Sequence, residues 1–428
     1  MQRLPARACL AAVVAAIAAI AALAAVAPAW AGGALETIDI TGAVPSPIPG
    51  LIDARVIPVR VDSRCIPLRF RVNDTLDPIP NPLGAPFVRI AAAIPVLQES
   101  LDQWNRIPTS FIDMRIIGTY ANPDLPGFDM VNEITFRTDD GFGAIAATSY
   151  TALIEDFQFT PGLDLNGDGI PDVVDGITTC ADIGGHIKFP PGFYKAGTIL
   201  DVDTEFNTKA SNGYRFTLAD AQVDTDPRSV DLRAVATHEG GHAHGLSHVL
   251  NNNNSRTDGT GSTMFPNLDT ADPVSERAQR HLAPDDIAWS SFFYPVGSSA
   301  SGPARVRPGK IPFSSVYGVI SGSVRHGELG QPLAGASVDA YDLLTGSWFT
   351  SAFSGTTRFA YDPVAGTLSF VDVAHDIVNG NFAMPVKLGL YRLGVQPVNG
   401  FPVAAGAINY TTQIGAAYGQ QSFNEGFY

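Results

Sequence analysis

The sequence predicts an α+β fold, in which a twisted mixed sheet with several helices is followed by a small all-β sandwich. Three observations predict this division. Hydrophobic residues make up 45% of the 428 residues and charged residues 16%, so the chain has enough apolar side chains to form a core. Up to residue 296, apolar residues recur at both helix and strand spacing. After a glycine- and proline-rich linker at 297–309, only strand spacing continues, over 310–428.

Residues 1–31 have the form of a secretory signal peptide. Arg3 and Arg7 precede an unbroken apolar run over 8–27, and Ala-Trp-Ala at 29–31 has the small-x-small form of a cleavage site. The run is long enough to span a bilayer, so a retained anchor is the alternative. We expect cleavage and secretion, because alanine dominates the run and no basic cluster follows it.

The chain is acidic, with 27 Lys and Arg against 42 Asp and Glu and a formal net charge of −15. Such a surface repels the phosphates of nucleic acid and the headgroups of anionic membranes. We therefore expect no nucleic-acid partner and, after signal cleavage, no membrane partner. The acidic side chains can instead hold calcium.

Strand and helix spacing alternate along residues 32–296. The segment 32–50 is rich in glycine and proline and is expected to be extended. Alternating apolar and polar residues predict strands at 56–61, 68–72, 134–136 and 199–206. Apolar residues at three- and four-residue steps predict a helix through Ile90, Ile94, Leu97, Leu101 and Trp104. Pro95 either kinks this helix or starts it. Further helices are expected at 231–246 and at 285–293, the latter with Pro284 in its first turn.

Three cysteines are present, and Cys9 lies in the predicted signal peptide. Cys65 and Cys180 remain in the mature chain. In an oxidising compartment, one disulfide between them is the simple expectation, and two free buried thiols are the alternative.

A histidine-rich segment at 238–248 carries the clearest chemical signal. It reads His-Glu-x-x-His-x-x-Gly-x-x-His. On a helix, His238 and His242 are four residues apart, so they project from one face and can share a metal ion. Gly245 is expected to end the helix in the left-handed conformation, which lets His248 turn back as a third ligand. Zinc suits imidazole nitrogens, and three protein ligands leave one position open, as in catalytic sites.

Glu239 follows the first metal ligand and is expected to face the open position. It is the expected general base toward a water molecule there, and the later proton donor to a leaving amine. Gly240 and Gly241 each cost about 1 kcal/mol in a helix interior relative to alanine, so a helix kept for packing alone would rarely carry both. His244 lies off the ligand face and is expected to be solvated.

The eleven-residue motif resembles the metzincin signature. Met264, within Ser262-Thr263-Met264-Phe265-Pro266, is similar to the metzincin Met-turn in its matrixin form. Four further segments resemble the first long helix, a central strand, the substrate-binding edge strand and the last helix of matrixins: 101–105, 134–136, 200–207 and 282–287. The resemblance implies a zinc metalloprotease domain over 32–296 that hydrolyses peptide bonds in a protein or peptide substrate. It also implies that Met264 lies beneath the metal.

The chain departs from the matrixin pattern near its start. The stretch between residues 31 and 56 is too short for the usual pro-domain. Cys65, preceded by Arg64, only faintly resembles the cysteine that caps the zinc of latent matrixins. His186 falls near the place where matrixins hold a structural zinc, but the sequence shows no partners for it, so we do not assign it a metal.

A second motif at 164–175 resembles a calcium loop, with Gly169 at its sixth position. Its oxygen-bearing side chains stand at positions 1, 3, 5, 9 and 12: Asp164, Asn166, Asp168, Asp172 and Asp175. The loop is similar to the free-standing loops of dockerins and thrombospondin-type repeats. We expect a structural Ca²⁺ here, and an acidic surface turn is the alternative.

Residues 310–428 resemble a carboxypeptidase-regulatory-like, or transthyretin-like, β-sandwich. The segments that carry this resemblance are 318–324, 331–341, 380–382 and 389–393. The pattern is informative about fold and almost silent about function, and it identifies no partner for the sandwich.

Together these features predict a secreted zinc-dependent metalloendopeptidase. The alternative is a non-enzymatic extracellular binding or scaffold protein built on a metzincin domain, which the sandwich and the calcium loop favour. A zinc hydrolase that acts on something other than peptides is a third, weaker hypothesis. The intact Glu239 favours the enzyme, because a scaffold has no need of that carboxylate.

Overall fold

The computed structural model describes residues 36–39, 41, 52–84, 86–121, 127–138, 144–209, 211, 213–249, 262–265, 268, 273–297, 308–327, 330, 332, 336–354, 356–362, 367–369, 377–397 and 426–427. The predicted signal peptide and most of the predicted linker lie outside these residues. Within them, no helix is both long and apolar enough to cross a membrane.

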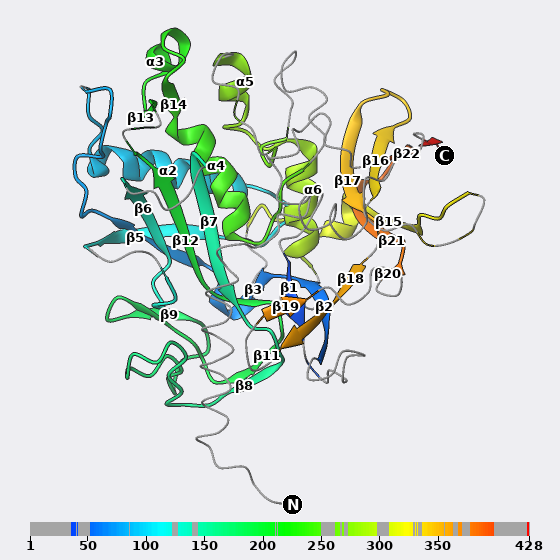
Figure 1. Ribbon diagram of the computed structural model, residues 1–428, viewed down its shortest axis with the longest axis horizontal. Helices are drawn as coiled ribbons and strands as arrows, with labels where there is room; N and C mark the ends of the chain where they lie inside the picture. The colour runs from blue at the N-terminus through cyan, green and yellow to red at the C-terminus, as the bar shows by residue number, and fades with distance from the viewer. Residues whose placement is uncertain are drawn as a thin grey trace, which may run out of the picture.

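A six-stranded sheet forms the centre of the larger part of the molecule (Figure 1). Five strands run parallel in the order β3-β12-β6-β4-β5, and β7 pairs antiparallel with β12. Their bounds are Arg60–Val61 for β3, Leu68–Asn73 for β4, Met114–Tyr120 for β5, Glu133–Arg137 for β6, Ala146–Ala152 for β7 and Thr198–Asn207 for β12.

The position of β12 corrects one prediction. Residues 200–207 were expected to be the edge strand, but β12 pairs with β6 on one side and with β7 on the other. The edge strand is instead β7, whose sequence Ala-Ala-Thr-Ser-Tyr-Thr-Ala has too few large apolar residues to show strand alternation. Conversely, β12 is buried along nearly its whole length, as expected of an interior strand.

Two helices pack together on one face of this sheet. The first is α2, Ile90–Asn105, which begins five residues before Pro95 and contains it; the second is α4, Leu232–Ala243. The indole nitrogen of Trp104 donates a 2.9 Å hydrogen bond to the carbonyl of Thr237, so α2 and α4 are held by a buried polar contact as well as by apolar packing. The remaining helices of this part are α3 at Asp220–Thr225, α5 at Pro273–Ala278 and α6 at Pro284–Phe293.

An insertion between β7 and β12 covers the opposite side of the sheet. It contains the antiparallel pair β8–β11 and, between these strands in sequence, the hairpin β9–β10; a parallel pair β13–β14 follows β12. The bounds are Phe157–Phe159, Ala181–Ile183, His186–Lys188 and Gly192–Tyr194 for β8 to β11, and Arg215–Thr217 and Ser229–Asp231 for β13 and β14. Cys180 of this insertion forms a disulfide with Cys65. This is the disulfide that the sequence suggests, and it leaves Cys65 no free thiolate with which to cap a metal ion.

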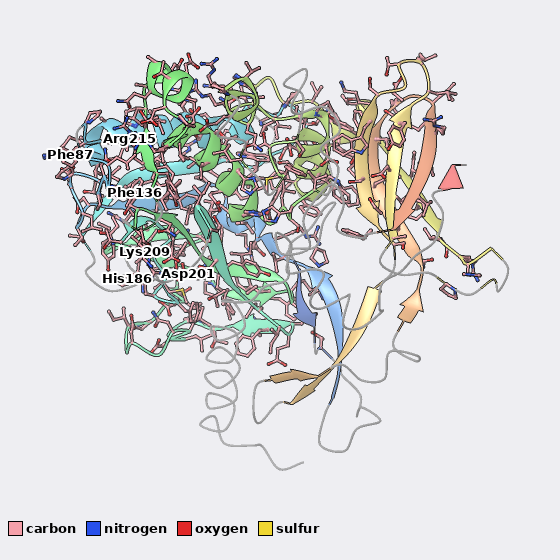
Figure 2. The ribbon with its side chains drawn as sticks, turned by 45° about the horizontal axis from the view of Figure 1, so that its top comes forward. Phe87, Phe136, His186, Asp201, Lys209 and Arg215 are labelled. Atoms are coloured by element: carbon pink, nitrogen blue, oxygen red, sulfur yellow. A yellow bond between two sulfur atoms is a disulfide. The ribbon has the colours of Figure 1, made fainter. Side chains whose placement is uncertain are left out.

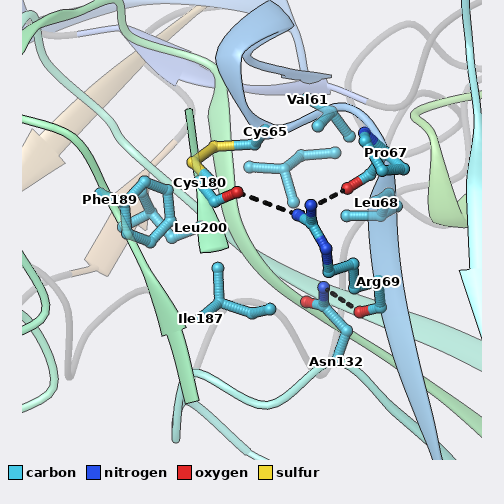
Figure 3. Close-up of a pocket in the computed structure, with 11 residues that line it drawn as sticks. Val61, Cys65, Pro67, Leu68, Arg69, Asn132, Cys180, Ile187, Phe189 and Leu200 are labelled. Carbon is cyan, nitrogen blue, oxygen red and sulfur yellow. Dashed lines mark hydrogen bonds between the residues drawn. A yellow bond between two sulfur atoms is a disulfide. The ribbon is translucent and has the colours of Figure 1, made fainter. Parts of the chain in front are cut away.

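A small cavity lies beside the disulfide (Figure 3). Arg69 reaches along its wall and donates hydrogen bonds to the carbonyls of Cys180 (2.9 Å) and Pro67 (3.2 Å). The Asn132 amide donates to the carbonyl of Arg69 at 2.8 Å. The disulfide and these bonds tie the insertion to β4 and to the loop before β6.

The C-terminal part contains a two-stranded sheet, β15–β21, and a four-stranded sheet, β17-β16-β22-β23. Their bounds are Tyr317–Ser323 and Asn381–Lys387, then Trp348–Phe353, Ala336–Asp342, Tyr391–Pro397 and Gly426–Phe427. The predicted linker and sandwich are not separate from the first part: Lys310 donates to the carbonyls of Asn105 (2.8 Å) and Ile107 (2.6 Å) at the end of α2.

A five-stranded sheet joins N-terminal strands to strands of the C-terminal part. It contains β1 (Glu36–Asp39), β2 (Ile52–Pro58), β18 (Thr356–Asp362), β19 (Thr367–Ser369) and β20 (Ile377–Asn379). Strand β18 pairs antiparallel with β2, with Arg358 opposite Arg55, and the two lie side by side in Figure 1. The segment 32–50, which was expected to be extended, thus contains a strand, and the predicted division at 297–309 does not separate the strands in space.

The disulfide encloses a long loop, so its removal is expected to destabilise the fold. The two cysteines are 115 residues apart in sequence, which corresponds to a loss of about 5 kcal/mol in the free energy of unfolding. Urea unfolding of the oxidised and the reduced chain measures this loss. The double variant Cys65→Ser/Cys180→Ser should match the reduced chain and be insensitive to reductant. Equal stability of the oxidised and reduced chains would contradict the prediction.

Candidate metal centre

The helix that carries the histidine motif begins and ends with identifiable caps. Asp231 is its N-cap, and the Asp231 carboxylate accepts a 3.0 Å hydrogen bond from the Arg233 N–H. The helix ends at Ala243, three residues before the predicted end. Gly245 has a φ of +99°, the left-handed conformation that the motif predicts. A Cβ atom there would lie 2.5 Å from the Val59 carbonyl oxygen, so the turn also needs glycine for close packing.

This turn brings the three histidines of the motif together. The Nε2 atoms of His238, His242 and His248 form a triangle in which each pair is 3.1 Å apart. Zinc with ligand bonds of about 2.0–2.1 Å in a tetrahedral site holds its ligand nitrogens about 3.3–3.4 Å apart. The triangle therefore has nearly the size that three zinc ligands require. Among the described residues, this is the group of His, Cys, Asp and Glu side chains whose ligand atoms converge on one point.

The hydrogen bonds of the rings show why a cation fits between them. His238 Nδ1 lies 2.6 Å from the carbonyl of Thr263, and His242 Nδ1 lies 2.7 Å from that of Leu246. Carbonyls only accept, so both Nδ1 atoms carry the proton and both Nε2 atoms present a bare lone pair. Burial lowers the pKa of His238 to about 4 and that of His242 to about 3, and it lowers the pKa of His248 as well. All three rings are thus neutral at pH 7, which metal ligation requires.

Glu239 lies beside the triad and faces the edge strand. Its side chain is buried, and its carboxylate accepts a 2.7 Å hydrogen bond from the Thr148 hydroxyl of β7. The Thr148 hydroxyl is in turn 3.0 Å from that of Thr204 on β12. Burial raises the pKa of Glu239 to about 7, against a smaller lowering by the Thr148 hydrogen bond. The hydroxyl of Thr148, rather than the cation of a Lys or Arg side chain, holds the Glu239 carboxylate in place.

The two glycines of the motif have a packing role, which corrects the sequence interpretation. A Cβ atom on Gly240 would lie 3.0 Å from Trp104 Nε1, and one on Gly241 would lie 2.2 Å from Met264 Sδ. The approach at Gly241 is closer than real Cβ atoms come, and the one at Gly240 is tighter than most real Cβ contacts. Both glycines therefore let α4 sit directly against Trp104 and Met264. Met264 is buried below the helix, as the resemblance to a Met-turn implies.

The turn around Met264 is held by one carboxylate. Asp286 of α6 is buried and accepts hydrogen bonds from the Ser262 hydroxyl (2.6 Å), the Thr263 N–H (2.9 Å) and the Met264 N–H (3.2 Å). The same turn supports the histidine triad, because the carbonyl of Thr263 accepts from His238 and the carbonyl of Met264 accepts a 2.9 Å hydrogen bond from the N–H of Val249. Val249 directly follows the third histidine.

His244 was expected to be solvated, and this prediction is wrong. Its side chain is fully buried, with ring centroids 4.7 Å from Trp104 and 5.8 Å from Tyr294. Its Nδ1 atom lies 2.6 Å from the carbonyl of Gly240, and burial lowers its pKa to about 4. The sequence pattern places His244 off the ligand face, but that face of α4 meets α2 and α6 rather than solvent.

The five predicted calcium ligands do not form a converging group in the structure. Asp164 accepts hydrogen bonds from the N–H groups of Gly167 (2.7 Å) and Gly169 (2.8 Å), which close a tight turn. Asn166 and Asp168 bond within the same turn, and Asp175 accepts from its neighbour Gly176. Asp172 is buried and pairs with the ammonium group of Lys188 at 3.1 Å. Calcium at this loop therefore stays a prediction, and Asp172 already has a cationic partner.

His186 lies outside the metal centre. Its Nδ1 atom is 3.1 Å from the carbonyl of Asp129, whose N–H donates to the Asp201 carboxylate at 3.0 Å. Figure 2 shows His186 and Asp201 close together. Asp201 is fully buried, and burial, with nearby Asp129, raises its pKa well above the usual range. This carboxylate was not identified from the sequence, where it looked like one polar residue of an alternating strand.

Two residues at the site were not predicted to act there. Thr148 was missed because β7 has no strong strand pattern, and threonine is common at such positions. Asp286 was identified only as one of two acids near the start of a helix. An acid at the third helical position after Ala283 and Pro284 is a capping signal, and its carboxylate does accept the Ala283 N–H at 2.8 Å. The sequence does not reveal that it also binds the Met264 turn.

Comparison of the chain with protein-family models, with curated proteins and with solved structures finds no match. The arrangement of the three histidines, Glu239 and Met264 must therefore be interpreted from its own chemistry. The resemblance to metzincins rests on the motif and on the order of the elements around it.

The contact between Gly241 and Met264 predicts that replacing this glycine by alanine destabilises the fold, although alanine usually stabilises a helix. In a helix free of tertiary contacts, alanine is favoured over glycine by about 1 kcal/mol. Here we expect Gly241→Ala to lower the free energy of unfolding by about 1–3 kcal/mol, because the new methyl group overlaps Met264 Sδ. Urea denaturation measures the change. The same substitution should cost less in a Met264→Ala background, and a stabilised Gly241→Ala chain would refute the assignment.

Calcium is expected to raise the free energy of unfolding, and Asp168→Ala to remove that increment. Asp168 is exposed, so its loss should cost little when calcium is absent. Asp172→Ala is the matched comparison. It breaks the buried pair with Lys188 and should cost about 3–5 kcal/mol even in chelator. Urea unfolding in calcium and in EGTA measures both effects, and an intact chain that is equally stable in the two solutions would favour a plain acidic turn.

Proposed function

We propose that this chain is a secreted zinc-dependent metalloendopeptidase of the metzincin type. One observation carries the proposal: the buried His242 and the half-buried His238 and His248 direct their Nε2 atoms at one another at 3.1 Å. Two of these nitrogens are bare because their rings donate through Nδ1 to carbonyls. Lone pairs that converge without a proton between them repel, and a cation relieves that repulsion. Imidazole ligands in this geometry are typical of zinc.

The residues around the triad support hydrolysis rather than a purely structural site. A zinc ion held by His238, His242 and His248 would supply Lewis acidity, which makes water more acidic and polarises a carbonyl group. Glu239 is the carboxylate on the same helix turn. It can accept the proton that water gives up and return it to the leaving amine. The 2.7 Å hydrogen bond from the Thr148 hydroxyl fixes the orientation of the Glu239 carboxylate. Less conformational entropy is therefore lost when Glu239 accepts a proton from water.

The edge of the sheet offers a place for an extended peptide. Strand β7 pairs with β12 along one side, and no other described strand pairs with its second side. A peptide that adds to this side forms main-chain hydrogen bonds with β7, which is a general mode of peptide recognition. Thr148 lies in the middle of β7, so a peptide bound there passes close to Glu239. This placement favours an endopeptidase over a hydrolase of small molecules.

The alternative, a non-enzymatic scaffold protein, requires fewer features of this site than an enzyme does. A binding protein needs the histidines and zinc only for stability, and it does not need a buried acidic side chain beside them. Burying a carboxylate costs free energy unless hydrogen bonds compensate it. Glu239 has a single hydroxyl donor, Thr148, on its Oε2 atom. A catalytic role of the Glu239 carboxylate explains why the chain bears the free-energy cost of burying it.

Glu239→Gln is expected to bind one zinc ion and to lose peptide cleavage. General acid–base catalysis contributes about 10²–10⁴-fold, so kcat/KM should fall by that factor. Thr148→Val should lower it by about tenfold or more, because a hydrogen bond to a charged group contributes about 1.5–3 kcal/mol. Cleavage of a mixed peptide library, followed by mass spectrometry, gives these rates alongside zinc content.

Thr151→Val is the matched control for this series. Thr151 lies on the same strand, opposite Asp201 in the register with β12, and the substitution has the same size. Its cleavage rate should equal that of the unaltered chain. If the unaltered chain binds one zinc ion and cuts no peptide in the library, the scaffold function replaces the proposed one.

A further inference from the structure

Helix α6 lies between the metal centre and the C-terminal sheets (Figure 1). Two adjacent aspartates near its start, Asp285 and Asp286, are both buried. Their carboxylates bind different parts of the molecule. Asp286 binds the turn around Met264, and Asp285 binds strand β17 of the sandwich. A single turn of helix thus contacts the support of the metal ligands on one side and a separate sheet on the other.

The contact with the sandwich is specific. Asp285 accepts hydrogen bonds from the Thr350 hydroxyl at 2.5 Å and from the Ser351 N–H at 3.3 Å. Trp289, one helical turn later, donates its indole N–H to the carbonyl of Ser351 at 3.1 Å. Both main-chain groups of Ser351 are therefore satisfied by side chains of α6. Strand β17 is the outer strand of its sheet, since it pairs with β16 on one side.

The contact with the metal centre is equally specific. Asp286 accepts from Ser262, Thr263 and Met264, as described above. The carbonyl of Thr263 then fixes the ring of His238, and the carbonyl of Met264 fixes the chain next to His248. Four successive hydrogen-bonded or covalent links therefore join Thr350 to His238, and five join it to His248.

We propose that the C-terminal sandwich positions the metal ligands, with Thr350 as the positioning residue at the contact. The interpretation of the ligands as a zinc site rests on the proposed function, whereas the coupling between β17 and the Met264 turn does not. The sandwich is on this view part of the metal centre's support, rather than a spacer attached to a complete catalytic domain.

The physical basis is the burial of both carboxylates. A buried carboxyl group that loses a donor is left with an unsatisfied oxygen, so it moves to find another partner. Asp285 cannot move far without moving Asp286, because they share the first turn of α6. Ligand geometry at a metal centre tolerates shifts of only about 0.5 Å before binding weakens. A small displacement of α6 is thus enough to disturb the carbonyl that orients His238.

The test compares Thr350→Val, Thr350→Ser and Ser337→Ala in the full chain. Valine removes the donor and keeps the shape, while serine keeps the donor. Ser337→Ala removes a buried hydroxyl that donates to Asp339 within the sandwich, and so controls for a general loss of sandwich stability. Zinc affinity is measured by competition with a chelator. Amide hydrogen exchange at Thr263, Met264 and Val249 is measured on the metal-free chain.

Thr350→Val is expected to weaken zinc binding and to speed exchange at the three amides, each by about two- to thirty-fold. Thr350→Ser and Ser337→Ala should match the unaltered chain in both measurements. Unchanged exchange and affinity in Thr350→Val, or an equal change in Ser337→Ala, would overturn the inference. If the unaltered chain binds no zinc, the proposed function fails, and the exchange rates alone decide whether the sandwich positions the turn.

Discussion

The rest of the site depends on one packing contact, in which Gly240 and Gly241 of α4 lie against Trp104 and Met264. It sets how deeply the helix lies in the domain, because Gly241 and Met264 Sδ leave no room for a methyl group. The depth of the helix in turn fixes where His238 and His242 point and which carbonyls their Nδ1 atoms meet. Burial then keeps the rings neutral, which is the protonation state that the proposed metal binding requires.

The sequence predicts local features of this fold well, because short-range spacing determines them. Helices α2 and α6 follow from apolar periodicity and from Pro284 in the first turn, and Gly245 has the left-handed φ that the motif requires. The convergence of the three histidines also follows from spacing and one turn. In each of these cases the relevant residues lie within about one to three helical turns of each other.

Features that depend on distant segments could not be predicted. His244 is buried because α2 and α6 cover it, and Thr148 meets Glu239 because β7 forms the edge of the sheet. The calcium loop shows the same limit, since Asp172 pairs with Lys188 from a neighbouring strand. The two glycines were assigned to function when packing explains them. Sequence spacing does not indicate which face of a helix or strand will pack against a distant helix or strand.

The pairing of β2 with β18 has a consequence for how the chain folds. Strand β2, Ile52–Pro58, leads toward the central sheet and pairs with β1 on one side, but its second partner, β18, comes roughly 300 residues later in the chain. The edge of β2 opposite β1 therefore stays unpaired until most of the chain has been synthesised. Closing so large a loop is slow, and an unpaired strand edge exposes the growing chain to aggregation. Folding of this molecule is therefore expected to complete as a late event, and truncation before residue 356 should leave β1 and β2 paired with each other but without β18.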